Sequence, residues 1–215
     1  MIVILGESGS GKSTVESVLS RDFGYRKVVS FTTREKRDGE VDGVDYRFIP
    51  KSKFEDMICE GKLDEYVNYN GMYYGSRRPT QEDMIELGYD PTKLVAVLTP
   101  HGYRQYVRKY GDKIFGVRIW VDETSRAINS LKRGTSLETV YLRAQKDIGY
   151  FDGITDEVNV SLENPRYTFT AYEIAKVIDE HYREYLEKYG VIACEDSIPS
   201  LCSTEGNGAL EDPIY

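Results

Sequence analysis

The sequence predicts an α/β fold in which a parallel sheet carries helices on both faces, with a small α+β subdomain inserted. Short apolar runs alternate with helix-like segments along most of residues 2–189, and such alternation is typical of parallel sheets covered by helices. A glycine-rich segment directly follows the first apolar run, as expected where a strand turns into a helix. Between about residues 31 and 78 the chain becomes rich in Tyr, Gly and charged residues, which indicates the insertion.

Length, charge and cysteine content limit the protein class. A chain of 215 residues can bury a substantial core, and we expect one domain at residues 1–190 followed by a weakly ordered acidic tail at 191–215. With 28 basic and 36 acidic residues, the net charge is −8, which argues against nucleic acid or an anionic membrane as partner. There is no apolar stretch of transmembrane length and no room for a signal peptide before residue 6. The three scattered cysteines predict neither a disulfide framework nor a zinc site, so we expect a reducing cytoplasm.

The first elements are predicted from apolar runs and the residues that end them. Ile2–Leu5 is a continuous apolar run of the buried-strand type. A helix is expected from Lys12 to about Asp22, ending before Gly24, and Lys27–Phe31 reads as a second strand.

The insertion is expected to have its own sheet. Asp45–Ile49 and Leu63–Tyr69 are strand-like, and Tyr69-Asn70-Gly71-Met72 is typical of a type I′ hairpin turn. Between them, Ser52-Lys-Phe-Glu55 matches a capping box that would open a short helix ending at Gly61.

The alternation of strands and helices then resumes. A capping box at Thr80-Gln-Glu-Asp83 predicts a helix that ends at Gly88. The remaining expected elements are a strand at Leu94–Leu98, a helix at Gly102–Tyr110, a strand at Lys113–Val121, helices at Thr124–Lys132 and Glu138–Tyr150, a strand at Glu157–Leu162 and an amphipathic helix from about Ala171 to Tyr189.

The glycine-rich segment matches a known phosphate-binding pattern. Gly6-Glu-Ser-Gly-Ser-Gly-Lys-Ser-Thr14 matches the phosphate-binding pattern G-x-x-x-x-G-K-[S/T] between strand and helix, which predicts a sheet of the P-loop NTPase type and a nucleoside triphosphate as ligand. Lys12 would reach the β- and γ-phosphates, and Ser13 would hold Mg²⁺. A glycine-rich turn that matches by chance is the alternative. The residues expected to bind the donor are Gly6, Ser8, Gly9, Ser10, Gly11, Lys12, Ser13 and Thr14.

A second pattern lies in the insertion. The segment from Ser30 to Phe48 contains T-T-R-x-x-R-x-G-E-x-x-G-x-x-Y, and with segments 63–66 and 72–76 it resembles the nucleotide-acceptor region of guanylate kinases. The resemblance extends from the phosphate loop to about Glu163 with similar order and spacing. It implies a nucleoside monophosphate kinase that uses ATP and Mg²⁺ to phosphorylate GMP or dGMP, with the insertion at about 31–78 binding the acceptor.

The resemblance also implies roles for particular residues. Arg34, Arg37, Tyr46 and Tyr74 would bind the acceptor phosphate, for which forked guanidinium donors are suited. Ser30, Glu65 and Ser76 would read guanine, whose N1–H and 2-amino group can both donate to one carboxylate. Taken singly, the arginines also fit a solvated charge run and the tyrosines ordinary sheet packing.

A lid is expected at about residues 129–143. In the family, a flexible segment here closes over the ATP phosphates, so Arg133 and Arg143 would join Lys12 in neutralising the transferring phosphoryl group. The alternative is an ordinary helix–turn–helix corner. No histidine is needed as a base, because the acceptor phosphate is already ionised near neutral pH.

One stretch departs from the family. Many guanylate kinases carry Leu-Asp-x-Asp near the position of segment 95–102, where Val97 and Thr99 replace both aspartates. Thr99 would then contact the acceptor with a single hydroxyl. Two alternatives stay open: a kinase for another (deoxy)nucleoside monophosphate, and a non-catalytic binding module. Such modules typically have degraded phosphate loops, whereas Gly6, Gly11, Lys12 and Ser13 are all present.

Overall fold

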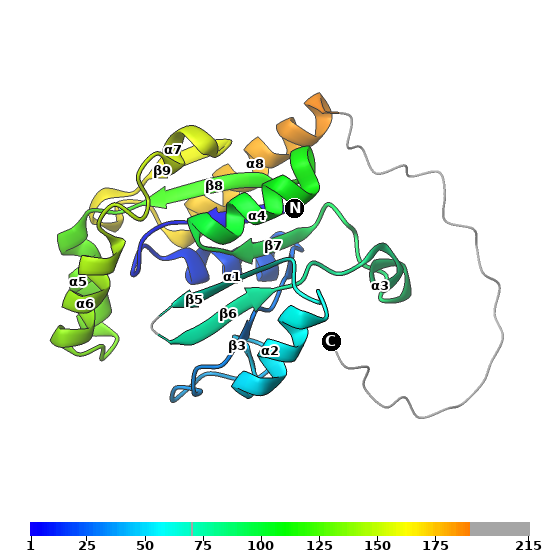
Figure 1. Ribbon diagram of the computed structural model, residues 1–215. Coiled ribbons are helices and arrows are strands. Elements are labelled where there is room, and N and C mark those ends of the chain that lie inside the picture. Colours follow the sequence, from blue (N-terminus) through cyan, green and yellow to red (C-terminus); the bar gives the residue numbers. More distant parts are fainter. Residues whose placement is uncertain (70, 190–215) are drawn as a thin grey trace.

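The computed structural model describes residues 1–69 and 71–189, and its centre is a five-stranded sheet (Figure 1). All neighbouring strands in this sheet are parallel, in the order β2-β7-β1-β8-β9. The strands are β1 Ile2–Leu5, β2 Arg26–Lys27, β7 Leu94–Val97, β8 Phe115–Trp120 and β9 Val160–Glu163. The predicted parallel sheet is confirmed.

Helices cover both faces of this sheet, as predicted (Figure 1). Ile2 and Ile4 of β1 pack into a core formed with α1 (Lys12–Asp22) and α8 (Ala171–Lys188). Met1, Val3 and Leu5 point to the other face, into a core formed with α4 and α7. The bounds of those two helices are Pro100–Tyr110 and Ile154–Glu157. Because both faces are covered at the middle of the sheet, the central strands β1 and β7 are apolar throughout rather than alternating.

The insertion forms a second, mixed sheet in the order β4-β3-β6-β5. Its strands are β3 Phe31–Thr32, β4 Arg47–Phe48, β5 Glu65–Tyr69 and β6 Met72–Ser76, and α2 Lys51–Cys59 lies between β4 and β5 in the chain. Strands β5 and β6 pair as an antiparallel hairpin in which Tyr69 faces Met72. This is the α+β subdomain expected from the change in composition.

Two predictions in this region need correction, and two other predicted features lie outside the described residues. The predicted strand Lys27–Phe31 is split, because the chain leaves the main sheet after Val28 and enters the inserted sheet at Phe31. The predicted capping box at Ser52 does not form, since α2 already begins at Lys51 after Pro50, without a side-chain cap. The expected type I′ turn includes Asn70, and the expected acidic tail is 191–215; both lie outside the described residues.

The remaining helices follow strands β6 and β8 in the chain. Helix α3 (Gln81–Glu86) begins with the predicted capping box, in which Thr80 Oγ1 accepts from Asp83 N at 3.1 Å. The lid corner is formed by α5 (Glu123–Lys132) and α6 (Leu137–Asp147), and α6 ends three residues earlier than predicted. Helix α7 was not predicted and takes up Glu157, the expected start of the last strand.

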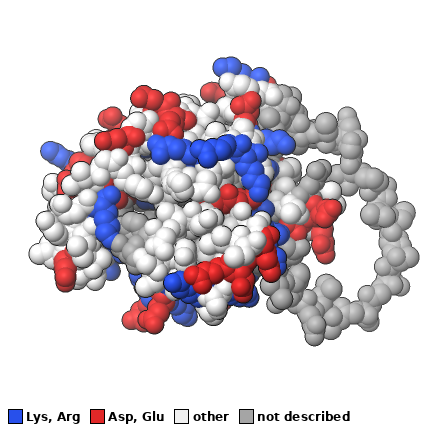
Figure 2. All heavy atoms as spheres, viewed as in Figure 1, with Lys and Arg blue, Asp and Glu red and all other residues white. Residues whose placement is uncertain are grey.

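The surface carries mixed charge, with both acidic and basic side chains spread over the face seen in Figure 2. None of the helices within residues 1–69 and 71–189 combines the length and apolar character needed to cross a bilayer.

Candidate active site

The phosphate-binding loop joins β1 to α1 at the carboxyl edge of the main sheet. Two of its glycines are required by close packing: a Cβ on Gly6 would lie 2.4 Å from Ile119 O, and a Cβ on Gly9 would lie 2.9 Å from Arg126 O. Gly11 adopts φ +89° and precedes the first residue of α1, so the loop delivers the positive end of the helix to its concave side. The backbone thus has the form of an anion-binding nest.

Lys12 is the first residue of α1 and its ammonium turns back over the loop. Its Nζ donates to Glu7 O at 2.8 Å. Burial lowers the pKa of Lys12 to about 8, opposed by the carboxylates of Asp147 and Glu7. A desolvated cation at the start of a helix favours an anionic ligand, which would restore the lost solvation.

The loop also has a hydroxyl group without a partner. Ser10 is 2 % exposed, and its Oγ makes no hydrogen bond within the described part of the chain. A buried polar atom of this kind is costly unless a ligand or water satisfies it. Ser13 and Thr14 are exposed at the start of α1, in position to contact a ligand held by the loop.

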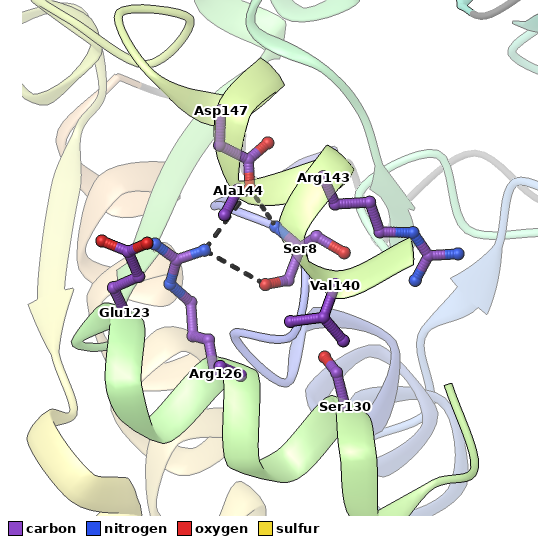
Figure 3. Close-up of a pocket in the computed structure, with 9 residues that line it drawn as sticks. Ser8, Glu123, Arg126, Ser130, Val140, Arg143, Ala144 and Asp147 are labelled. Atoms are coloured by element: carbon purple, nitrogen blue, oxygen red, sulfur yellow. Dashed lines mark hydrogen bonds and ion pairs between the residues drawn. The ribbon is translucent and has the colours of Figure 1, made fainter. Parts of the chain in front are cut away.

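The two helices of the predicted lid, α5 and α6, are hydrogen-bonded to the loop at their bases. Asp147 at the end of α6 accepts from Ser8 N at 3.0 Å. Arg126 of α5 donates to Ser8 O at 3.2 Å and lies 3.4 Å from Asp147 Oδ2 (Figure 3). Neither residue was predicted as part of the site, since they come together only in the folded protein.

The predicted lid arginines lie on this corner. Burial is the main cause of the lowered pKa of Lys12, and the positive charge of Arg133 contributes to it, which places Arg133 within electrostatic range of the loop. Arg143 lines a small pocket with Ser8 and Arg126, and its guanidinium points away from the Arg126–Asp147 pair (Figure 3). Gly134 between the two helices adopts φ +81°, which allows the tight corner.

The segment after β9 closes the other side of the loop. Tyr167 OH donates to Gly9 O, and Asn129 Nδ2 donates to Tyr167 OH at 3.1 Å. Arg166 and Tyr167 both have positive φ, at 55° and 54°. Non-glycine residues in this conformation are uncommon and concentrate at functional sites, and no sequence pattern indicated them here.

On the inserted sheet, three of the four predicted phosphate-binding side chains come together. The guanidinium of Arg34 lies over the ring of Tyr46 at 5.3 Å and also interacts with Tyr74. The two tyrosine rings pack edge to face with centroids 6.0 Å apart. Arg34 is at the same time held by Glu40 in a bidentate pair at 2.7 and 2.8 Å.

Arg37 is arranged differently. Its backbone N–H donates to Glu40 Oε2 at 2.8 Å, while its side chain is exposed and makes no hydrogen bond to a described residue. Glu40 therefore shapes the turn that carries both arginines. Glu40 belongs to the sequence pattern that resembles guanylate kinases, but its role as the partner of Arg34 was not predicted.

The predicted guanine-reading residues form a buried polar group. Ser76 Oγ donates to Glu65 Oε1 at 2.8 Å and lies 3.0 Å from Tyr106 OH. Glu65 and Ser76 are 4 % and 0 % exposed, and burial raises the pKa of Glu65 to about 7. A Cβ on Gly102 would lie 2.6 Å from Glu65 Oε2, so this glycine makes room for the carboxylate at the start of α4.

Two other predicted contacts are less specific. Ser30 lies just before β3 and is half-buried; its carbonyl accepts from Arg47 N at 2.9 Å. Thr99 caps α4, because its Oγ1 accepts from Gly102 N at 3.1 Å. The hydroxyl of Thr99 therefore has a structural partner, which leaves its hydrogen and one lone pair for a ligand.

A buried ion pair links the two halves of the site. Glu16 of α1, one turn after Lys12 and Ser13, is 7 % exposed and lies 3.1 Å from Lys27 Nζ at the end of β2. From Lys27 the chain leaves the main sheet for the insertion, so the pair joins the phosphate-loop helix to the root of the subdomain. No sequence pattern indicated it.

Comparison with known proteins identifies the relatives of this chain. The guanylate kinase family model matches residues 1–99. The guanylate kinase of Clostridium tetani is 32% identical over 219 residues, covering 100% of this chain and 97% of that protein. The guanylate kinase of Streptococcus agalactiae is 33% identical over 190 residues, covering 85% of this chain and 88% of that protein. The crystal structure of guanylate kinase from Anaplasma phagocytophilum has the same fold, with a TM-score of 0.61 at 23% identity, covering 86% of this chain and 85% of that one.

Proposed function

The chain belongs to the guanylate kinase family, and we propose that it transfers the γ-phosphoryl group of ATP to GMP or dGMP, giving ADP and the nucleoside diphosphate. The observation that carries the acceptor assignment is the buried Glu65–Ser76 pair. It lies on the same small sheet as the Arg34 cluster, so one subdomain offers a base-reading carboxylate and an anion-binding group.

The donor site is the phosphate loop. The nest of Gly6, Gly9 and Gly11, the desolvated ammonium of Lys12 and the unsatisfied hydroxyl of Ser10 fit the triphosphate of ATP. The described residues contain no cluster of three His, Cys, Asp or Glu side chains, so Mg²⁺ would rest on Ser13, the phosphates and water. When bound, this ion would neutralise charge on the phosphates.

The acceptor site would hold GMP by both ends. Arg34 and Arg37, with Tyr46 and Tyr74, would bind its phosphate, and Arg34 would share its donors between that phosphate and Glu40. Glu65 would accept from the N1–H and 2-amino groups of guanine. A site that hydrogen-bonds its substrate in this way can reject an analogue without the partner groups by about 10⁴–10⁵.

The chemistry needs alignment and charge neutralisation rather than a base. The acceptor phosphate has a second pKa of about 6, so an oxygen is already ionised at neutral pH. His181 is not needed as a base in this mechanism, and it lies exposed on α8 with its Nδ1 2.8 Å from Val177 O. Lys12, Arg133 and Arg143 would stabilise the charge on the transferring group, and closure of the lid corner would exclude water.

Production of ADP across all common nucleoside monophosphates and deoxynucleoside monophosphates, with ATP and Mg²⁺, tests this proposal. We expect GMP and dGMP to support turnover at least about 100-fold better than AMP, CMP or UMP. Turnover with a nucleotide of another base would identify that nucleotide as the acceptor in place of GMP or dGMP. If no acceptor supported ADP formation, the result would indicate a non-catalytic binding module. Because its substrates are ATP and a nucleotide, we expect the protein in the cytoplasm.

A further inference from the structure

A large groove lies on the opposite edge of the main sheet from the phosphate loop. Its volume is about 780 Å³, and its walls include the residues that precede strands β1, β7 and β8, namely Met1, Thr92 and Lys113. The phosphate loop follows β1 at the carboxyl edge, so this groove at the amino edge is separate from the donor site. Neither the reaction nor the acceptor site described above uses it.

The groove combines an apolar floor with a basic rim. Met84, Tyr182 and Leu186 are among its apolar lining residues. Five Lys or Arg side chains line it against two Asp side chains, and of the five, Lys62 and Arg77 are already paired with Glu60 and Asp83. Asp64 already accepts from Lys109, whereas Lys113 forms no ion pair with any described residue. A ligand with carboxylates and apolar side chains would match this surface.

The chain itself supplies such a ligand. Residues 190–215 contain five Asp or Glu and no Lys, Arg or His, together with apolar residues such as Ile192, Ile198 and Leu201. They follow directly on α8, whose last turns form one wall of the groove: Tyr182, Tyr185 and Leu186 all line it. Tyr185 OH also donates to Asp112 O at 2.9 Å, which fixes the end of α8 to the groove rim.

We propose that this groove is the docking site of the protein's own C-terminal segment, residues 190–215. Attachment next to the groove gives the segment a high effective concentration there, so weak contacts suffice. The groove also lies directly behind the guanine pocket, because its lining residues Asp64 and Arg77 are the sequence neighbours of Glu65 and Ser76. The docked segment would therefore brace the β5–β6 hairpin from the side away from the acceptor.

Disulfide trapping in the full-length protein tests this assignment, because the segment contains Cys194 and Cys202. The exposed Cys59 is first replaced by Ser. In that background, Ile85→Cys places a thiol on the groove wall, where Ile85 is 75% exposed. The matched control is Lys176→Cys, which lies on α8, nearer in sequence to the segment and outside the groove.

With oxidised glutathione, Ile85→Cys should form a disulfide with Cys194 or Cys202 within one chain at least about tenfold faster than the control. Adding Lys113→Glu to the Ile85→Cys protein, or raising the salt concentration, should slow this trapping. Peptide mapping by mass spectrometry identifies the linked cysteines. Equal trapping rates at both positions, or no trapping in the groove, would overturn the proposal. Disulfides that form only between chains would assign the groove to a second copy and overturn it as well.

Discussion

Recognition of the acceptor should depend on pH near neutrality, because Glu65 titrates there. Burial raises the pKa of Glu65 to about 7, so its ionised form, which accepts from guanine, predominates only above that pH. Acceptor binding should therefore strengthen as the pH rises through 7 and weaken as the pH falls. With this pKa, the population of ionised Glu65 in the free protein changes about tenfold between pH 8 and pH 6. The KM for GMP should rise by the same factor at the lower pH.

The measurement is the initial rate of ADP formation, separated chromatographically, at pH values from 6 to 8 with GMP varied. The KM for ATP, measured in the same buffers, serves as internal control. The matched variant is Glu65→Gln, which keeps the shape but cannot ionise. Loss of a hydrogen bond to a charged group costs about 1.5–3 kcal/mol, so its KM for GMP should be about ten- to 150-fold higher.

The variant also separates Glu65 from the substrate's own titration. The GMP phosphate, with a pKa of about 6, ionises in both proteins and leaves a common dependence at the acid end. The additional dependence around pH 7 should be present in the wild type and absent in Glu65→Gln. An identical pH profile in the two proteins would refute the role of Glu65 as the guanine acceptor.

Three further outcomes are expected. Lys12→Ala should lower kcat at least about 100-fold with little change in Tm. In the wild type, the KM for ATP should rise above pH 8, because Lys12 loses its charge there, its pKa being lowered to about 8. Normal turnover of the variant, or a KM for ATP that stays constant up to pH 9, would contradict the loop assignment. Arg37→Ala should raise the KM for GMP about tenfold or more without changing Tm, since its side chain is exposed, and an unchanged KM would remove it from the acceptor site. Gly9→Ala should weaken ATP binding, measured by calorimetry, and lower Tm more than the control Gly24→Ala, because only at Gly9 would a Cβ lie 2.9 Å from Arg126 O. Equal effects of the two substitutions would count against the close packing at Gly9.

Local chemistry made much of the site predictable from sequence. The phosphate loop needs glycines, a lysine and a helix start within nine consecutive residues, so its place between β1 and α1 follows from the pattern alone. The antiparallel pairing of β5 and β6 also follows from the hairpin signal, and it places Glu65 opposite Ser76.

The parts that sequence reasoning missed depend on contacts between distant segments. Asp147 lies 139 residues from Ser8, and no local pattern specifies that pairing. Glu16 and Lys27 meet only when α1 packs beside β2. The capping box at Ser52 did not form for a different reason: Pro50 is the N-cap of α2, so the helix already begins at Lys51.

The attachment of Asp147 and Arg126 to Ser8 restricts how the α5–α6 corner, which is the proposed lid, can move. The bases of α5 and α6 share hydrogen bonds with the loop, so a swing of both helices as one body would break the frame of the donor site. We expect movement to be less costly at the far corner around Gly134, because the tip could bend there while its anchors stay in place. The ATP-binding loop would then keep its conformation through each catalytic cycle. Only the turns of α5 and α6 near Gly134 would need to reorganise before product leaves.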